Sequence, residues 1–306
     1  MNSVNSKYSA GNGRDSDSPG GEAPVRDTDA FQLLLMGHFD SSAVSVQFRN
    51  RMLEMAPRLQ PLVDAQWQQQ LAVARNDGRT LFDGEMLRLD GYHRCTGLNG
   101  RDCLELQMSR TKYSQFVGTN LAADRQSFLD DSTQWSNPLG LSALIVCDDE
   151  KILLGLRGKG TFLYSGYWHT FGGMADLRDV DERGNVSLFN VIRRELTEEL
   201  GITKSDVTRM HSMGLVRDRA ILQPEMIFEV HVAKPSADII SRATSPCITS
   251  SDPCLESTDS NNEHDRFCAI DDNAPSVDAF VKSHPTKITP VALATLTRHF
   301  HPIAGG

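Results

Sequence analysis

Three carboxylates lie within one short segment of the chain, Arg194-Glu195-Leu196-Thr197-Glu198-Glu199-Leu200-Gly201-Ile202. On a helix, residues three and four apart are neighbours, so Glu195, Glu198 and Glu199 share one face. Carboxylates this close repel one another unless a cation neutralises them. Arg194 is one candidate cation, and a hard divalent ion with a preference for oxygen ligands is another. Such an ion screens a diphosphate and activates water, which is the chemistry of phosphoanhydride hydrolysis. The alternative is a solvated acidic helix face, since glutamate is a common helix residue.

The neighbouring elements predict how this segment is positioned. Apolar residues at helical spacing predict a helix over residues 188–200, which Gly201 ends in the left-handed conformation. A short strand over residues 167–171 runs into Gly172-Gly173 before that helix. The same patterns predict strands over 31–35, 86–89, 103–108, 141–146, 151–156, 207–216 and 226–232, and helices over 60–75 and 290–300. This order predicts an α/β fold, with helices on both faces of a mixed sheet.

The nine residues match the pattern REUXEEXGU, in which U is aliphatic, and the segment resembles the signature of the Nudix hydrolases. The resemblance implies an α/β/α sandwich with the metal helix beside the sheet. It implies a metal site for Mg²⁺, or for Mn²⁺, made by the backbone carbonyl of Gly172 with Glu195, Glu198 and Glu199. Glu198 and Glu199 would also serve catalysis, and Arg194 would orient Glu195.

The match to the longer family motif, GX5EX7REUXEEXGU, is incomplete. Counting forward from Gly173 places its first glutamate at Asp179, whereas counting back from Arg194 places it at Val186. An insertion therefore separates the two halves. Asp179 and Glu182 are candidates to replace the missing glutamate, and we expect activity to survive the change.

The region before the signature resembles Nudix hydrolases that split UDP-glucose and UDP-galactose into UMP and sugar 1-phosphate. The resembling pieces are Leu81-Phe82-Asp83, Leu87-Arg88-Leu89, residues 111–120 (TKYSQFVGTN) and Asn137-Pro138-Leu139-Gly140. The resemblance touches most of the chain after about residue 31, apart from residues 236–264. The alternatives are a Nudix hydrolase of another nucleoside diphosphate, such as ADP-ribose, a dinucleotide or coenzyme A, and a Nudix module that binds a nucleotide without cleaving it.

Residues 113–120 are predicted to form a loop, and under this resemblance its residues 116–120 help to bind the nucleotide. Gly118 allows a close approach of the backbone, and Thr119 and Asn120 offer hydrogen-bonding groups. Tyr113 is a candidate to stack on the base, and Arg157 is a candidate to contact a phosphate or the sugar. The alternatives are a structural turn, a core tyrosine and a surface arginine.

The catalytic base is expected outside the signature. Glu225, directly before an apolar strand, is the first candidate and Glu229 the second, with Glu263 and His264 as remote options. The alternative for Glu225 is a charge at a strand edge. His169 lies near the glycine pair in sequence, but strand alternation is expected to turn it into the fold.

Composition and segment boundaries complete the prediction. We expect a disordered tail over residues 1–29, an α+β region over 30–135 that contributes to the nucleotide pocket, and a Nudix domain over 136–306 with a flexible insertion at 236–264. The net charge of −9 disfavours nucleic acid as a partner. The resemblance implies a small nucleoside diphosphate as the substrate. No apolar run is long enough to cross a membrane. The oligomeric state is not predicted.

The six cysteines form no CxxC pair. Together with the absence of a recognisable signal peptide, this spacing predicts reduced thiols and a cytoplasmic protein.

Overall fold

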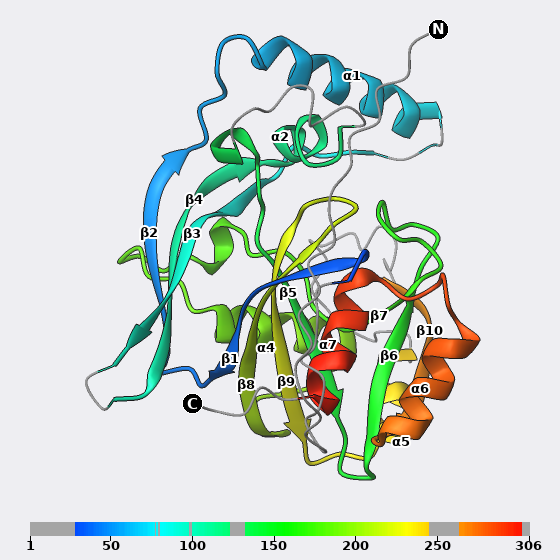
Figure 1. The fold of residues 1–306 in the computed structure, drawn as a ribbon. Helices are drawn as coiled ribbons and strands as arrows, with labels where there is room; N and C mark the ends of the chain where they lie inside the picture. Colours follow the sequence, from blue (N-terminus) through cyan, green and yellow to red (C-terminus); the bar gives the residue numbers. More distant parts are fainter. Residues whose placement is uncertain are drawn as a thin grey trace, which may run out of the picture.

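The computed structural model describes residues 28–76, 78, 80–97, 100–122, 132–244 and 263–301. The predicted tail at residues 1–27, and residues 245–262 of the predicted insertion, lie outside the described residues. The described residues form two β-sheets, a larger one in the lower part of Figure 1 and a smaller one above it.

The larger sheet has seven strands and mixed pairing, as the sequence predicted. Its order is β1 (Phe31–Phe39), β8 (Val207–Asp218), β9 (Pro224–Val232), β5 (Gly140–Val146), β6 (Lys151–Arg157) and β10 (His264–Asp271), with β7 (Trp168–His169) also paired to β6. β5 and β9 are parallel, and the other pairs are antiparallel. Since β1 pairs with β8, a segment near the start of the chain completes one edge of this sheet.

Helices cover both faces of the larger sheet, because alternate residues of each strand point to opposite faces. On β5, Ala143 and Ile145 pack in one core cluster with the apolar residues of α4 (Leu188–Leu200). Leu144 and Val146 pack on the other face, in a cluster that includes residues of α6 (Ala274–Ser283) and α7 (Pro290–Phe300). The predicted α/β class, with helices on both faces of a mixed sheet, is confirmed.

The smaller sheet has the order β2 (Val44–Met52), β4 (Asp102–Lys112) and β3 (Glu85–Thr96), with β2 parallel to β4. The helices α1 (Gln60–Asn76) and α2 (Tyr113–Gly118) lie at the top of Figure 1, above this sheet. Buried side chains of β3 and β4 belong to the same core cluster as α4, so the two sheets share one core. Two short 3₁₀ turns, Ser132–Gln134 and Leu177–Asp179, complete the connections.

Two predicted loops are regular elements. Residues 113–118 form the helix α2, whose Gly118 packs against α1 so closely that a Cβ there would lie 2.6 Å from the Cα of Val63. The glycine serves helix packing, and the expected loop is wrong for this segment. The predicted insertion begins with the helix α5 (Ser236–Thr244), whose Ile239 is buried, and ends where β10 begins. The polar composition of this stretch gave no sign of the helix at its start or of the strand at its end.

The expectation of reduced thiols is wrong for one pair of cysteines. Cys95 on β3 faces Cys103 on β4 across the hairpin, and the two form a disulfide with a Cα–Cα distance of 4.8 Å. Strand register brought them together, and sequence spacing does not reveal register. The cytoplasmic location is no longer supported by reduced thiols and stays a prediction. No helix among the described residues is long and apolar enough to cross a bilayer.

Candidate active site

The helix α4 forms over the residues predicted for it and carries the acidic segment. Its apolar side is buried at Leu196 and Leu200, which fixes the helix against the sheet. Gly201 ends it with φ of 63°, and the backbone N–H of this residue donates to the carbonyls of Leu196 and Thr197. The carboxylates therefore differ in exposure to solvent. The side chain of Glu199 is 7% exposed and that of Glu198 is 54% exposed.

Arg194 is the hub of the acidic segment. Its guanidinium lies 3.0 Å from a carboxylate oxygen of Glu195 and 3.1 Å from one of Glu198. Its Nε and second terminal nitrogen donate to the two carboxylate oxygens of Asp179, at 3.2 and 3.1 Å. Asp179 also accepts a hydrogen bond from the backbone N–H of Asp176. Of the two candidates for the missing glutamate, Asp179 thus contacts the signature arginine, whereas Glu182 is exposed on the following turn.

The glycine pair lies against the acidic residues and leaves no room for a side chain. Gly172 has φ of +148°, and a Cβ there would collide with the carbonyl oxygen of Leu141. A Cβ on Gly173 would lie 2.8 Å from the carboxyl carbon of Glu195. The backbone N–H of Leu141 donates to the carbonyl of Gly173, which ties the pair to β5. Gly172 therefore requires glycine, whereas a side chain at Gly173 would have to displace the carboxylate of Glu195.

Glu199 meets two residues that lie more than sixty positions later in the sequence. Ligand atoms of Glu199, Glu263 and His264 all lie within 4.8 Å of one another. Both carboxylate oxygens of Glu199 and the Nδ1 of His264 are buried and have no hydrogen-bond partner. Burial, and then the charge of Glu263, raise the pKa of Glu199 well above its usual range. A carboxylate buried in this way requires either a proton or a cation.

Glu195 is also perturbed. Burial, opposed by the charge of Arg194 and assisted by that of the nearby Glu199, raises the pKa of this carboxyl to about 7. Glu195 and Glu199 thus form a partly buried pair of like charges beside the glycine pair, an arrangement that a hard cation would neutralise.

A cavity of about 210 Å³ opens beside the glycine pair and contains the candidate base. Its lining includes Gly172, Gly173, Glu225, Arg157 and Glu263. Burial, and then the charge of Asp218, raise the pKa of Glu225 to about 8, while Arg157 opposes the increase. The structure therefore places Glu225 and Arg157 together with the predicted glycine pair.

Comparison with known proteins agrees with the signature. The chain is 29% identical over 244 residues to Nudix hydrolase 9 of Arabidopsis thaliana, which covers 68% of this chain and 76% of that protein. The signature and this relative support the Nudix hydrolase family. They also indicate an enzyme that hydrolyses a pyrophosphate bond. No family model matches the chain.

Solved structures are less similar to this chain. DR0079 from Deinococcus radiodurans has a TM-score of 0.35 at 11% identity, covering 53% of this chain and 83% of its own. A MutT protein from Methanosarcina mazei has a TM-score of 0.32 at 17% identity, covering 54% and 93%. Similarity at this level carries no argument about activity.

Apart from Arg157, the residues predicted to hold the nucleotide do not line this cavity. Thr119 and Asn120 are buried and occupied, since Thr119 donates to a backbone carbonyl and Asn120 bonds to Asn137. Tyr113 makes edge contacts with Trp67 of α1, at a centroid distance of 5.9 Å, and with Phe162 of the loop after β6, also at 5.9 Å. That loop continues into residues that line the cavity, so Tyr113 reaches the site through one intermediate ring.

Two other candidates occupy fixed places. Glu229 bonds to His231 and His299, both at 2.7 Å, in a network on the α7 side of the sheet. His169 bonds to Thr289 at 2.6 Å, and burial lowers its pKa well below the usual range. No local pattern favours Glu263 and His264, because a polar stretch precedes them and the pairing of β10 with β6 brings them to Glu199.

Proposed function

We propose that this Nudix hydrolase catalyses the Mg²⁺-dependent hydrolysis of a nucleoside diphosphate sugar, UDP-glucose or UDP-galactose, to UMP and sugar 1-phosphate. The observation that carries the proposal is Glu199. Its two buried oxygens lack hydrogen-bond partners, the Nε2 of His264 lies 3.5 Å from one of them, and two more carboxylates, Glu195 and Glu263, lie beside it. A protein stabilises such a group only with a cation or a proton.

The residues present fit a divalent ion. The oxygens of Glu195 and Glu199 and the backbone carbonyl of Gly172 would hold it, with Glu263 as a further oxygen donor, and such hard donors favour Mg²⁺, with Mn²⁺ as an alternative. When bound, the ion would screen the diphosphate and lower the pKa of a water ligand. Glu198 is exposed and paired with Arg194, so it would contribute to the metal site only after leaving that ion pair.

The other side chains have roles that follow from their places. Arg194 positions Glu195, because it is itself held by Asp179. Glu225 accepts a proton from the attacking water in its ionised form, and its raised pKa of about 8 makes it a stronger base than an ordinary carboxylate. Arg157, whose Nε donates to the carbonyl of Leu163 at 3.0 Å, keeps its terminal nitrogens for a phosphate oxygen.

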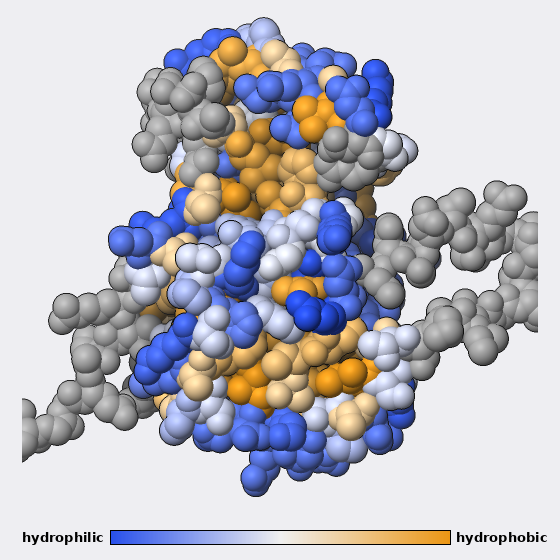
Figure 2. All heavy atoms as spheres, turned by 90° about the vertical axis from the view of Figure 1, so that its right-hand side faces the viewer, coloured by the Kyte–Doolittle hydropathy of each residue, from blue (hydrophilic) through white to orange (hydrophobic). Residues whose placement is uncertain are grey.

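A nucleoside fits the region that extends from the cavity. The loop after β6 carries Leu163 and Tyr164 into the cavity lining, while its Phe162 packs on Tyr113. Figure 2 shows apolar residues gathered below the upper helices on this side of the molecule. Aromatic rings beside a phosphate-binding cavity suit a base that stacks while the diphosphate reaches the acidic centre.

Phosphorus NMR of the products tests the proposal. The protein is incubated with UDP-glucose and Mg²⁺ in ¹⁸O-labelled water, with ADP-ribose as comparator. Glu199→Gln is the test variant, and Glu182→Gln, which changes an exposed carboxylate, is the matched control. We expect UMP and glucose 1-phosphate from the wild type and from Glu182→Gln, and no turnover by Glu199→Gln. The label identifies which phosphorus is attacked.

Other outcomes would change the assignment. Cleavage of ADP-ribose alone would keep the hydrolase and reject the UDP-sugar substrate. Binding of either compound without cleavage by the wild type would favour a nucleotide-binding module.

A further inference from the structure

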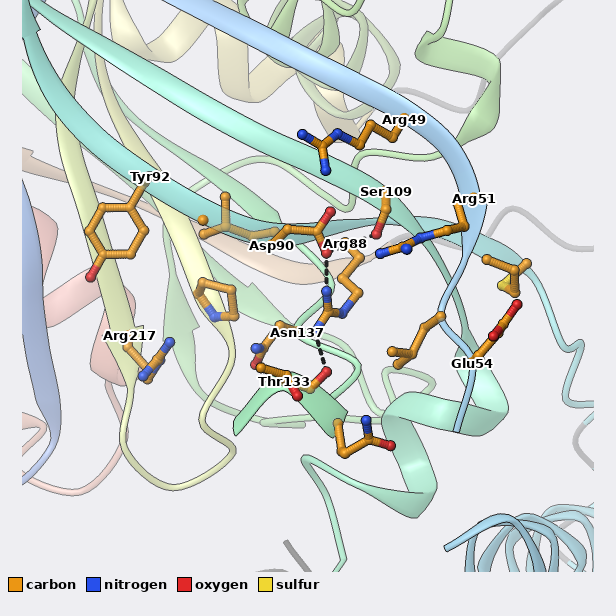
Figure 3. Close-up of a pocket in the computed structure, with 16 residues that line it drawn as sticks. Arg49, Arg51, Glu54, Arg88, Asp90, Tyr92, Ser109, Thr133, Asn137 and Arg217 are labelled. Atoms are coloured by element: carbon orange, nitrogen blue, oxygen red, sulfur yellow. Dashed lines mark hydrogen bonds and ion pairs between the residues drawn. The ribbon is translucent and has the colours of Figure 1, made fainter. Parts of the chain in front are cut away.

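A second and larger cavity, of about 520 Å³, lies between the smaller sheet and the end of the β8–β9 hairpin. Figure 3 shows that arginines from three strands surround it: Arg49 and Arg51 from β2, Arg88 from β3 and Arg217 from β8. Its volume is within the range of sites that bind small molecules, about 300–1,000 Å³.

The charge of this cavity is incompletely neutralised. Of the carboxylates in its lining, Asp90 is occupied by an ion pair with Arg88 and a hydrogen bond from Ser109. The other is Glu54. Four guanidinium groups thus face two carboxylates, in a chain whose net charge is −9. The positive excess is local, and it is opposite in sign to the charge of the whole molecule.

The arginines divide into one that is fixed and three that are available. Arg88 is held by its ion pair and by donating to the backbone carbonyls of Trp135, at 3.0 Å, and Thr133, at 2.7 Å. Within the part of the chain that the structure describes, Arg49, Arg51 and Arg217 have no ion pair. The Nε of Arg217 is buried and has no hydrogen-bond partner. Burial, and then the charge of Arg51, lower the pKa of Arg88, as expected where guanidinium groups crowd together.

This cavity is separate from the Glu225 cavity. In the β8–β9 ladder Arg217 pairs with Pro224, and Val216 pairs with Glu225. Consecutive strand residues point to opposite faces, so Arg217 and Glu225 lie on opposite sides of the sheet. The neighbouring core agrees, because Leu215 belongs to the cluster on the α4 side whereas Val216 belongs to a cluster with residues of α7.

The chemistry of the lining selects the ligand. A planar guanidinium binds phosphate oxygens in pairs, and several arginines together match a group that carries two negative charges. Asn137 adds a neutral amide group for further hydrogen bonds. We propose that the arginine cavity binds a phosphorylated small molecule, at a site distinct from the acidic centre. The proposal does not depend on which substrate that centre hydrolyses.

Calorimetric titration of the full chain in EDTA tests this site, since anions are repelled from the acidic centre when no metal is present. The probes are inorganic pyrophosphate and UMP, and the tighter binder shows whether the ligand is an inorganic or a nucleotide phosphate. The test variant is Arg51→Gln/Arg217→Gln, with Arg49→Gln/Arg51→Gln as a second pair that changes only exposed residues. Arg183→Gln, exposed on the turn before α4, is the control.

We expect one saturable site for at least one probe in the wild type and in Arg183→Gln. Each double variant should bind at least about tenfold more weakly, since each lost charge-assisted hydrogen bond is worth roughly that factor. Wild-type binding should also weaken as salt is added. The proposal is overturned if neither probe binds the wild type, or if both double variants bind as tightly as Arg183→Gln does.

Discussion

Replacing Glu199 by glutamine is expected to stabilise the metal-free protein while it abolishes activity. A catalytic substitution usually has no reason to increase stability. Here the carboxylate is buried, both of its oxygens lack hydrogen-bond partners, and burial raises its pKa well above the usual range. Glutamine has nearly the same shape and no charge, so it removes the cost of burying either a charge or an added proton.

The magnitude follows from linkage. In the unfolded chain the carboxyl titrates near its ordinary value of 4.5. At pH 7.5, keeping it protonated in the folded chain costs up to about 4 kcal/mol, because each pH unit above the unfolded pKa adds about 1.4 kcal/mol. The folded pKa is raised, so this penalty is absent below pH 4.5 and grows as the pH rises. We therefore expect Glu199→Gln to increase the free energy of unfolding by about 1–4 kcal/mol at pH 7.5, and by little at pH 4.5.

Thermal and urea unfolding in EDTA across this pH range measure the effect. Each kcal/mol corresponds to roughly 2–4 °C in Tm for a chain of this size class. Glu198→Gln is the matched control, because this carboxylate on the same helix is 54% exposed and loses only one ion pair of 3.1 Å, worth about 0.5 kcal/mol or less. Added Mg²⁺ should raise the Tm of the wild type and not that of Glu199→Gln. A variant less stable than the wild type at pH 7.5, or a difference that does not shrink on acidification, would refute the reasoning.

Three further predictions concern other parts of the structure. Gly172→Ala should lower the free energy of unfolding by about 1–3 kcal/mol in thermal melts, because φ of +148° and the carbonyl of Leu141 exclude a side chain; unchanged stability would contradict this account. If Glu225 is the base, kcat/KM should fall as the pH drops below about 8, where its carboxylate becomes protonated, and Glu225→Gln should flatten that limb of the profile. The pair Glu229–His299 should stabilise the fold most between pH 4.5 and 6.5, since the pKa of Glu229 is lowered from 4.5 and that of His299 is raised from 6.5. Its contribution is lost as the pH falls through the lowered pKa or rises through the raised one, so urea unfolding of His299→Asn should differ most from the wild type inside that window and converge with it outside.

Local sequence was sufficient for the elements that depend on nearby residues. The helix over residues 188–200 and its end at Gly201 follow from apolar spacing and from the conformational freedom of glycine, and both formed as predicted. The mixed sheet with helices on both faces likewise followed from the alternation of strand and helix patterns. Residues 113–118 were predicted wrongly from local sequence. Polar residues beside a glycine are typical of a loop, but the packing of this segment against α1 makes it a helix.

Contacts between distant segments were decided only by the tertiary structure. The acidic stripe is visible in sequence, but the burial of Glu199 and its contact with His264 depend on the pairing of β10 with β6. The disulfide of Cys95 depends in the same way on the register of the β3–β4 hairpin. The arginine cavity needs three strands from two sheets, and no local pattern distinguishes Arg217 from a surface arginine. Sequence by itself determined which chemical groups the chain carries and the helix that holds the acidic segment. Strand register and packing decided which of those groups are buried side by side. Burying an unpaired charge costs enough free energy that such a site requires a ligand.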